Sequence, residues 1–268
     1  MSEKVQTARP VVAVVGPTAS GKSDLGLALA LRVGGEVVNC DSVQVYKEIE
    51  ARGRTALVVG GTGFYLRALR EPFFEAPPTD ARWRRRLVAL RERRGPEHLH
   101  KLLTRLDPES ASRLAPRDWS RVQRALELRL QTGIKLSARL AERPAPPKQA
   151  ARLRIFALNP PREELYRRID RRAEMHFRAG LVEEVRGLLA RGVPAETSAL
   201  GAHGYRRVVE YLRGERSLES AVEQTKLDVR HYAKRQLTWF RREPGVEWVE
   251  GFGEEARVQE EVARRLGL

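Results

Sequence analysis

The segment VVAVVGPTASGKS, residues 11–23, is the stretch of this 268-residue chain that decides its fold. Its first five residues are nearly all β-branched and carry no charge, which is typical of a strand buried on both faces of a parallel sheet. Residues 24–32 then alternate small residues with leucine like a helix packed on a sheet, and residues 36–39 resemble a second short strand. Together these pieces predict a strand, helix and strand unit with parallel strands.

The loop of this unit, residues 16–23, fits the pattern G-x-x-x-x-G-K-[ST]. Its glycines let successive N–H groups face a phosphate, Lys22 adds a positive charge, and the Ser23 hydroxyl can ligate Mg²⁺. We therefore expect an α/β fold with a P-loop NTPase-like parallel sheet core flanked by helices, and Mg²⁺ as cofactor. A glycine turn that binds nothing would leave the lysine unexplained. The predicted diphosphate-binding residues are Gly16, Pro17, Thr18, Ala19, Ser20, Gly21, Lys22 and Ser23.

Two more loops follow predicted strands, and the carboxyl ends of parallel strands meet where ligands bind. Asp41 follows the second strand. It could hold Mg²⁺ through water, act as a general base, or cap a helix. The third apolar run, residues 55–59, ends in Gly60-Gly61-Thr62-Gly63. The hydroxyl and N–H groups of that turn could contact a ligand, or the glycines could simply form a tight turn.

Proline pairs divide the chain into two predicted domains. Residues 77–148 begin at Pro77-Pro78, close near Pro146-Pro147, and carry leucines at helical spacing with arginines between them. This pattern predicts an all-helical, basic insertion. The core domain then comprises residues 1–76 and 149–268, with a fourth apolar run at 153–158, helices after it, and a short edge strand at 246–249.

The charge balance favours a polyanionic partner. The chain has 50 Lys and Arg against 35 Asp and Glu, a net charge of +15, and 42 of the basic residues are arginine. Residues 82–86 and 234–242 interleave cations with aromatic rings that could stack on unpaired bases or simply belong to the core. With a single cysteine, Cys40, and no apolar run near the 18 to 20 residues of a membrane span, we expect a cytoplasmic protein that does not enter a membrane.

The motifs coincide, in order and nearly end to end, with those of one family, and the chain resembles a bacterial tRNA dimethylallyltransferase (tRNA isopentenyltransferase). In addition to the phosphate loop, the matching segments are Asp41-Ser42-Val43-Gln44-Val45-Tyr46, Val59-Gly60-Gly61-Thr62-Gly63-Phe64-Tyr65-Leu66, Arg124-Ala125-Leu126-Glu127, Thr132-Gly133, Gly180-Leu181-Val182-Glu183-Glu184-Val185, Gly204-Tyr205 and residues 232–241, YAKRQLTWFR.

The resemblance implies an enzyme that moves a dimethylallyl group from dimethylallyl diphosphate to N6 of the adenosine on the 3′ side of the anticodon. It implies that Lys22, Arg172 and Mg²⁺ at Ser23 stabilise the departing diphosphate, that Asp41 takes the N6 proton, and that Thr62 lies against the target base. The tRNA contacts that it implies are Asp41, Ser42, Val43, Gln44, Thr62, Arg84, Ser120, Arg121, Val122, Gln123, Arg124, Lys234 and Arg235. The expected partners are a tRNA anticodon stem-loop and dimethylallyl diphosphate, and the expected state is a monomer.

The chain departs from this family at one place. Roughly fifty further residues usually separate the equivalent of Tyr46 from the helix before the Gly60-Gly61 turn, whereas here the sequence continues directly. We expect that a segment is missing from this sequence. Three other functions stay open: a P-loop kinase acting on a small metabolite, a relative that prenylates free adenine nucleotides, and an ATP-gated nucleic-acid-binding protein.

Overall fold

The computed structural model describes residues 10–39, 52, 54–71, 76–142 and 145–268. It divides into two compact units, one formed by Met1–Arg70 with Lys148–Leu268 and the other by Glu71–Pro147. We call the first the catalytic unit and the second the insertion, and describe each by itself. In this structure the insertion begins six residues earlier and ends one residue earlier than residues 77–148, the range expected from the proline pairs.

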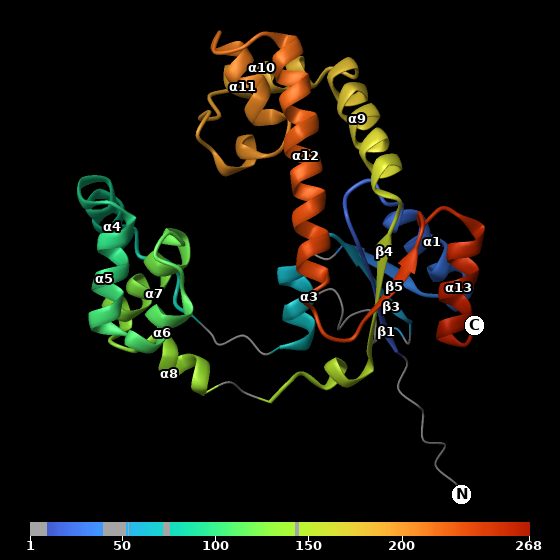
Figure 1. Ribbon diagram of the computed structural model, residues 1–268, viewed down its shortest axis with the longest axis horizontal. Coiled ribbons are helices and arrows are strands. Elements are labelled where there is room, and N and C mark those ends of the chain that lie inside the picture. The colour runs from blue at the N-terminus through green and yellow to red at the C-terminus, as the bar shows by residue number, and fades with distance from the viewer. Residues whose placement is uncertain (1–9, 40–51, 53, 72–75, 143–144) are drawn as a thin grey trace, which may run out of the picture. The chain divides into compact units, whose positions relative to one another are not determined.

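A five-stranded, all-parallel sheet forms the centre of the catalytic unit, with strand order β2-β3-β1-β4-β5 (Figure 1). The strands are β1 (Val11–Val15), β2 (Glu36–Asn39), β3 (Ala56–Gly60), β4 (Leu153–Asn159) and β5 (Val246–Glu250). All five residues of β1 are buried, because the strand lies in the middle of the sheet and helices cover both of its faces. The parallel sheet with flanking helices confirms the predicted fold class.

Alternate residues of β1 pack on opposite layers of helices. Val12 and Val14 contact α1 (Lys22–Val33) and α13 (Ala256–Leu266), whereas Val11, Ala13 and Val15 face α3 (Gly63–Arg70) and the end of α12 (Leu218–Phe240). In register, Val15 lies beside Gly60 of β3 and Ala157 of β4. The loops after β1 and β3 therefore leave the sheet at the same edge, next to each other.

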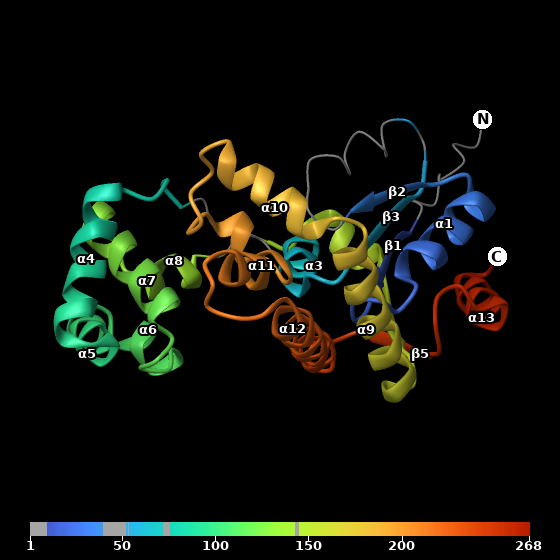
Figure 2. The ribbon, with the colours of Figure 1, turned by 90° about the horizontal axis from the view of Figure 1, so that it is seen from above.

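Four helices extend the catalytic unit beyond this edge of the sheet. They are α9 (Arg162–Arg178), α10 (Leu181–Ala190), α11 (Tyr205–Leu212) and the long helix α12, and a short 3₁₀ turn, Ser198–Gly201, precedes α11. Helices α9 and α12 run side by side, as both ribbon views show (Figures 1 and 2). A separate apolar cluster that includes Val185, Leu200 and Val208 joins α10 to α11. This cluster gives the helical layer its own core.

The insertion consists of α4 (Ala81–Arg94), α5 (Pro96–Leu106), α6 (Pro108–Arg113), α7 (Trp119–Thr132) and α8 (Leu136–Ala141) around a leucine-rich core. Its buried Asp107 is the N-cap of α6 and accepts hydrogen bonds from the backbone N–H and hydroxyl of both Ser110 and Ser137. Burial by itself raises the pKa of Asp107, but the bonds from the two serines outweigh it and lower the pKa to about 2. One carboxylate thus connects α6 to α8.

Among the described residues, no helix is both long enough and apolar enough to cross a membrane.

Candidate active site

The phosphate loop lies between β1 and α1, where the sequence predicted it. Gly21 is the N-cap of α1 and has a φ of 77°, a left-handed conformation that glycine adopts without strain. A Cβ atom here would lie 2.7 Å from the backbone nitrogen of Gly253, and that N–H donates to the Ser20 carbonyl at 2.9 Å. Only a glycine at position 21 lets the loop before α13 pack so closely on the phosphate loop.

Lys22 points back over the loop, and its Nζ donates to the Pro17 carbonyl oxygen at 2.7 Å. Burial and, to a smaller extent, the positive charge of Arg172 together lower the pKa of Lys22 to about 8. In the described part of the chain, no carboxylate forms an ion pair with this ammonium. The site therefore holds a cation whose charge is unfavourable until an anion enters.

A cavity of about 380 Å³ opens in front of this loop. Residues 18–24 line one side, and Arg168, Arg171 and Arg172 of α9 line another. Arg168 pairs with Glu254 and lies 3.5 Å from the centre of the Phe252 ring, so it is already engaged within the protein. The Arg172 Nε donates to His176 Nε2 at 3.3 Å. Converging cations beside the N-terminus of α1 suit a phosphate or diphosphate.

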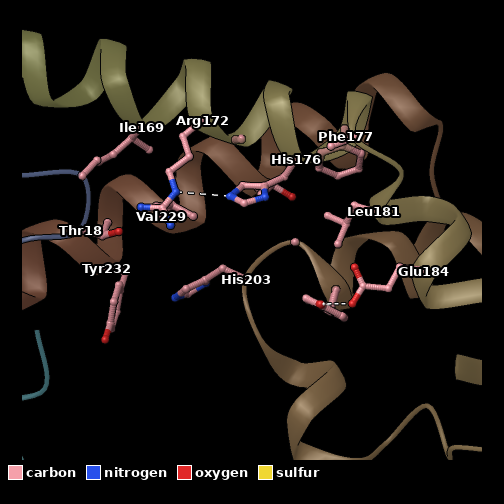
Figure 3. Close-up of a pocket in the computed structure, with 16 residues that line it drawn as sticks. Thr18, Ile169, Arg172, His176, Phe177, Leu181, Glu184, His203, Val229 and Tyr232 are labelled. Carbon is pink, nitrogen blue, oxygen red and sulfur yellow. Dashed lines mark hydrogen bonds between the residues drawn. The ribbon is translucent and has the colours of Figure 1, made fainter. Parts of the chain in front are cut away.

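A second pocket, of about 360 Å³, lies next to the first and shares the lining residues Thr18, Ala19 and Arg172 with it. Figure 3 shows the residues that line this second pocket. Its walls are largely apolar, with Ile169, Ala173 and Phe177 of α9, Leu181 of α10 and Val229 of α12. Polar side chains line its other parts. They are His176, Glu184 with the Tyr205 hydroxyl donating to it at 2.6 Å, and the neighbouring rings of His203 and Tyr232, whose centroids are 5.0 Å apart.

The predicted turn at residues 60–63 lies beside the phosphate loop, and Gln236 of α12 bridges the two. The Thr18 N–H donates to Gln236 Oε1 at 2.8 Å, and Gln236 Nε2 donates to the Gly61 carbonyl at 3.0 Å. Thr62, the next residue, is exposed. The structure therefore brings together the predicted residues of the phosphate loop, Arg172 and the turn that carries Thr62.

Four predicted residues, Asp41, Ser42, Val43 and Gln44, lie outside the described residues, as does the expected position of the missing segment. Their roles stay predictions.

The predicted tRNA contacts of the insertion divide into two groups. Ser120 and Arg121 are exposed in the first turn of α7. Val122 lies in the insertion core, and Gln123 is buried and donates to Glu127, so neither side chain faces solvent, and the tRNA contacts expected at these two positions stay predictions. The helical period of α7 turns them inward.

Two predicted arginines of the insertion already have partners within it. Arg84 binds the fully buried Glu127 through Nε at 2.9 Å, and Arg124 donates to the Pro77 carbonyl at 2.8 Å. Burial raises the pKa of Glu127, but the hydrogen bonds from Arg84 and Gln123 outweigh this and lower it. Both arginines therefore stabilise the insertion itself. In the catalytic unit, Lys234 and Arg235 are exposed on α12.

Sequence reasoning missed Arg168, Glu254 and Gln236. Arg168 lies one helical turn before Arg172, a spacing that could have indicated a shared face of α9. Glu254 and Gln236 contact the loop from distant parts of the chain, and no local pattern marks them. In the described residues, no group of three or more His, Cys, Asp or Glu side chains is arranged to hold a metal ion.

The fold and the phosphate loop define this chain as a P-loop α/β protein. Comparison with known proteins is more specific. The model of the IPP transferase family matches residues 40–243, and the model described as isopentenyl transferase matches residues 9–63. The chain belongs to the tRNA dimethylallyltransferase (IPP transferase) family, which confirms the resemblance found in its motifs.

Among its relatives, a tRNA dimethylallyltransferase of Solibacter usitatus is 39% identical over 302 residues, covering 96% of this chain and 98% of the relative. The Myxococcus xanthus tRNA dimethylallyltransferase is 41% identical, covering 88% and 91% of the two chains. The first alignment is longer than the 268 residues of this chain, so that relative carries residues that this chain lacks.

Solved structures agree with this assignment. The tRNA isopentenylpyrophosphate transferase of Bacillus halodurans is 29% identical, with a TM-score of 0.64 and 97% of each chain covered. A eukaryotic dimethylallyltransferase acting on tRNA has a TM-score of 0.74 over 90% of this chain and 74% of its own. At 23% identity, that match shows the shared fold alone.

Proposed function

We propose that this protein transfers a dimethylallyl group from dimethylallyl diphosphate to N6 of the adenosine on the 3′ side of the anticodon in tRNA. The observation that carries the proposal is the pair of connected cavities, one lined by the phosphate loop and arginines and the other largely apolar. A prenyl diphosphate has the same division into a charged head and an apolar chain. Membership of the tRNA dimethylallyltransferase family supports the same reaction.

In this reaction the bond between the prenyl carbon and the diphosphate oxygen breaks, a bond from N6 to that carbon forms, and N6 loses a proton. Lys22 and Arg172 would neutralise the negative charge that grows on the departing diphosphate. Thr62 would lie against the adenine, because its turn adjoins the phosphate loop. Asp41 would accept the proton, a role that rests on the family resemblance.

Mg²⁺ is the proposed cofactor, and the residues of the cavity fit it. Ser23 lines the cavity next to Lys22 with an exposed side chain, and Mg²⁺ is commonly held by few protein oxygens together with substrate phosphates. When bound, the ion would supply positive charge to the diphosphate. We also propose that the enzyme acts as a monomer on its two substrates.

The test is to incubate the protein and Mg²⁺ with dimethylallyl diphosphate and an unmodified anticodon stem-loop, and to measure nucleoside masses. We expect adenosine to gain the mass of one isopentenyl group only when the prenyl donor is present. A stem-loop with guanosine in place of the target adenosine is the matched control. Phosphate transfer from ATP in a parallel reaction, without prenyl transfer, would instead support a kinase, and modification of free AMP alone would support the nucleotide-prenylating relative.

A further inference from the structure

Gln236 is a buried polar side chain that links two loops of the active site. It lies on α12 with 6% of its surface exposed, and its amide reaches the Thr18 N–H at 2.8 Å and the Gly61 carbonyl at 3.0 Å. The N–H group can only donate and the carbonyl can only accept. The oxygen of the amide must therefore face Thr18 and the nitrogen must face Gly61, so the orientation of the side chain is fixed.

The amide fits only because the turn has a glycine at position 61. A Cβ atom on Gly61 would lie 2.1 Å from Gln236 Nε2 and 3.3 Å from the Gly16 carbonyl oxygen. Three segments that are far apart in the sequence, the phosphate loop, the turn after β3 and the C-terminal part of α12, therefore meet at this side chain. A larger residue at position 61 would force them apart.

The helix does not depend on this amide for its attachment to the sheet. Near the same end of α12, Phe240 is fully buried in the core under β1. Just beyond the helix, the buried Glu243 pairs with Arg67 at 2.7 Å and Arg70 at 2.9 Å, both on α3. These contacts hold α12 and α3 together independently of Gln236. What the amide adds is a fixed spacing between the two loops.

We propose that Gln236 is a positioning residue for the transfer reaction, and that it sets the distance between the phosphate loop and the turn that carries Thr62. Thr18 lines both cavities, and Thr62 directly follows the carbonyl that Gln236 binds. The inference rests on the proposed function, in which one loop holds the donor diphosphate and the other meets the acceptor base. Because transfer needs the two reacting atoms at a fixed separation, a small shift of either loop slows it.

Two variants test this role. Gln236→Met keeps a side chain of similar length but removes both hydrogen bonds, and Gly61→Ala displaces the amide from the other side. We expect each to lower kcat about 10- to 100-fold and to weaken the binding of pyrophosphate with Mg²⁺. The melting temperature should fall by a few degrees, because polar groups lose their partner, whereas the affinity for the stem-loop should stay near that of the wild type. The double variant should lose no more than the worse single variant, because both act on one link.

Gln224→Met is the matched control, since Gln224 lies on the same helix and its amide bonds to Asp228 instead of either loop. The proposal is wrong if folded Gln236→Met keeps the kcat and pyrophosphate affinity of this control. It is also wrong if its loss of activity simply follows a loss of thermal stability that Gln224→Met shares. If the wild-type protein transfers no prenyl group, the proposed function fails, but pyrophosphate affinity still reports whether Gln236 positions the phosphate loop.

Discussion

Lys22 in the phosphate loop and Asp107 in the insertion are both charged groups withdrawn from water, but their surroundings differ. Asp107 accepts four hydrogen bonds from two serines, whereas the Lys22 ammonium donates to one carbonyl and faces a second cation, Arg172. The pKa of each is lowered, to about 2 for Asp107 and about 8 for Lys22. A lowered pKa favours the charged form of an acid such as Asp107, but it disfavours the charged form of a base such as Lys22.

The difference separates a structural charge from a functional one. The hydrogen bonds from the two serines satisfy both oxygens of the Asp107 carboxylate, so its charge stabilises the folded insertion. The Lys22 ammonium has no anionic partner among the described residues and lies at the wall of a cavity that three arginines, Arg168, Arg171 and Arg172, also line. An incoming diphosphate would supply the missing negative charge, so the free energy lost by burying Lys22 without a partner is regained on binding.

Removing the Lys22 charge should have the largest effect on function. We expect Lys22→Ala to lower kcat/KM for dimethylallyl diphosphate by about 100- to 1000-fold, because a charge directed at the departing group is lost. The melting temperature should stay the same or rise, since a poorly partnered charge is removed. Steady-state kinetics, pyrophosphate calorimetry and thermal unfolding measure these effects. Lys101→Ala, on the exposed face of α5, is the control. If both variants bound pyrophosphate with equal affinity, the Lys22 charge would not be a functional one.

Asp107 should show the opposite pattern, with a large effect on stability. We expect Asp107→Ala to destabilise the insertion by about 3 kcal/mol, because the buried N–H and hydroxyl donors of two serines lose their acceptor. Pyrophosphate affinity should not change. Urea unfolding followed by the fluorescence of Trp83 and Trp119 measures the change. The comparison fails if the variant unfolds like the wild type.

The same carboxylate gives the insertion a dependence on acid. Its folded pKa of about 2 lies below the ordinary value of 3.8, so its contribution is fully present above pH 4 and is lost as the pH falls toward 2. The shift corresponds to about 2.5 kcal/mol. In Asp107→Ala this part of the acid dependence should be absent. Comparing the urea unfolding of the variant and the wild type at several pH values therefore separates the contribution of Asp107 from the contributions of the other carboxylates.

Lys22 should give diphosphate binding a dependence on alkaline pH. Its folded pKa of about 8 lies below the ordinary 10.5, so the free protein loses this charge above pH 8 and must regain the proton to bind an anion. We expect the Lys22-dependent part of pyrophosphate affinity to fall by up to about tenfold per pH unit above pH 8, with proton uptake on binding. Calorimetry in buffers of different ionisation enthalpy measures the uptake. A slope that persists unchanged in Lys22→Ala would assign the effect to the ligand instead.

What could be predicted from the sequence were the features encoded by neighbouring residues. The phosphate loop, its strand and its helix lie within residues 11–33, and the β-branched run is buried because a central parallel strand has two covered faces. Such patterns depend on backbone geometry over a few residues, so they can be read from the sequence before the fold is known.

The rest depends on packing between distant segments. Gln236 is 218 positions from Thr18 in the sequence, and Ser137 is 30 positions from Asp107, so no local sequence pattern predicts either contact. The orientation of residues 120–124 depends on packing in the same way. The sequence predicts tRNA contacts along this whole stretch, but the helix turns Val122 and Gln123 toward the core of the insertion, so the contacts at these two positions stay predictions.

Substitutions of the exposed arginines of the insertion should have the smallest effect on function, because these charges are solvated. Among the residues that the structure describes, Arg121 pairs with the partly exposed Asp118 alone, at 3.1 Å, and two thirds of its side chain is exposed. If it contacts a phosphate of tRNA, Arg121→Ala should weaken stem-loop binding about two- to fivefold at moderate salt and reduce the dependence on salt concentration by about one ion.

Arg124 is the matched partner for this test, because its guanidinium is held within the insertion by the Pro77 carbonyl. Arg124→Ala should therefore lower the stability of the insertion more than it changes the salt dependence of binding. Fluorescence anisotropy at several salt concentrations, together with urea unfolding, distinguishes the two variants. If Arg124→Ala alone changed the salt dependence, an internally bonded arginine would be the one that binds RNA. The comparison of Lys22 with Asp107 suggests that a charge without a partner inside the protein marks a binding site. That conclusion would then not extend to this surface.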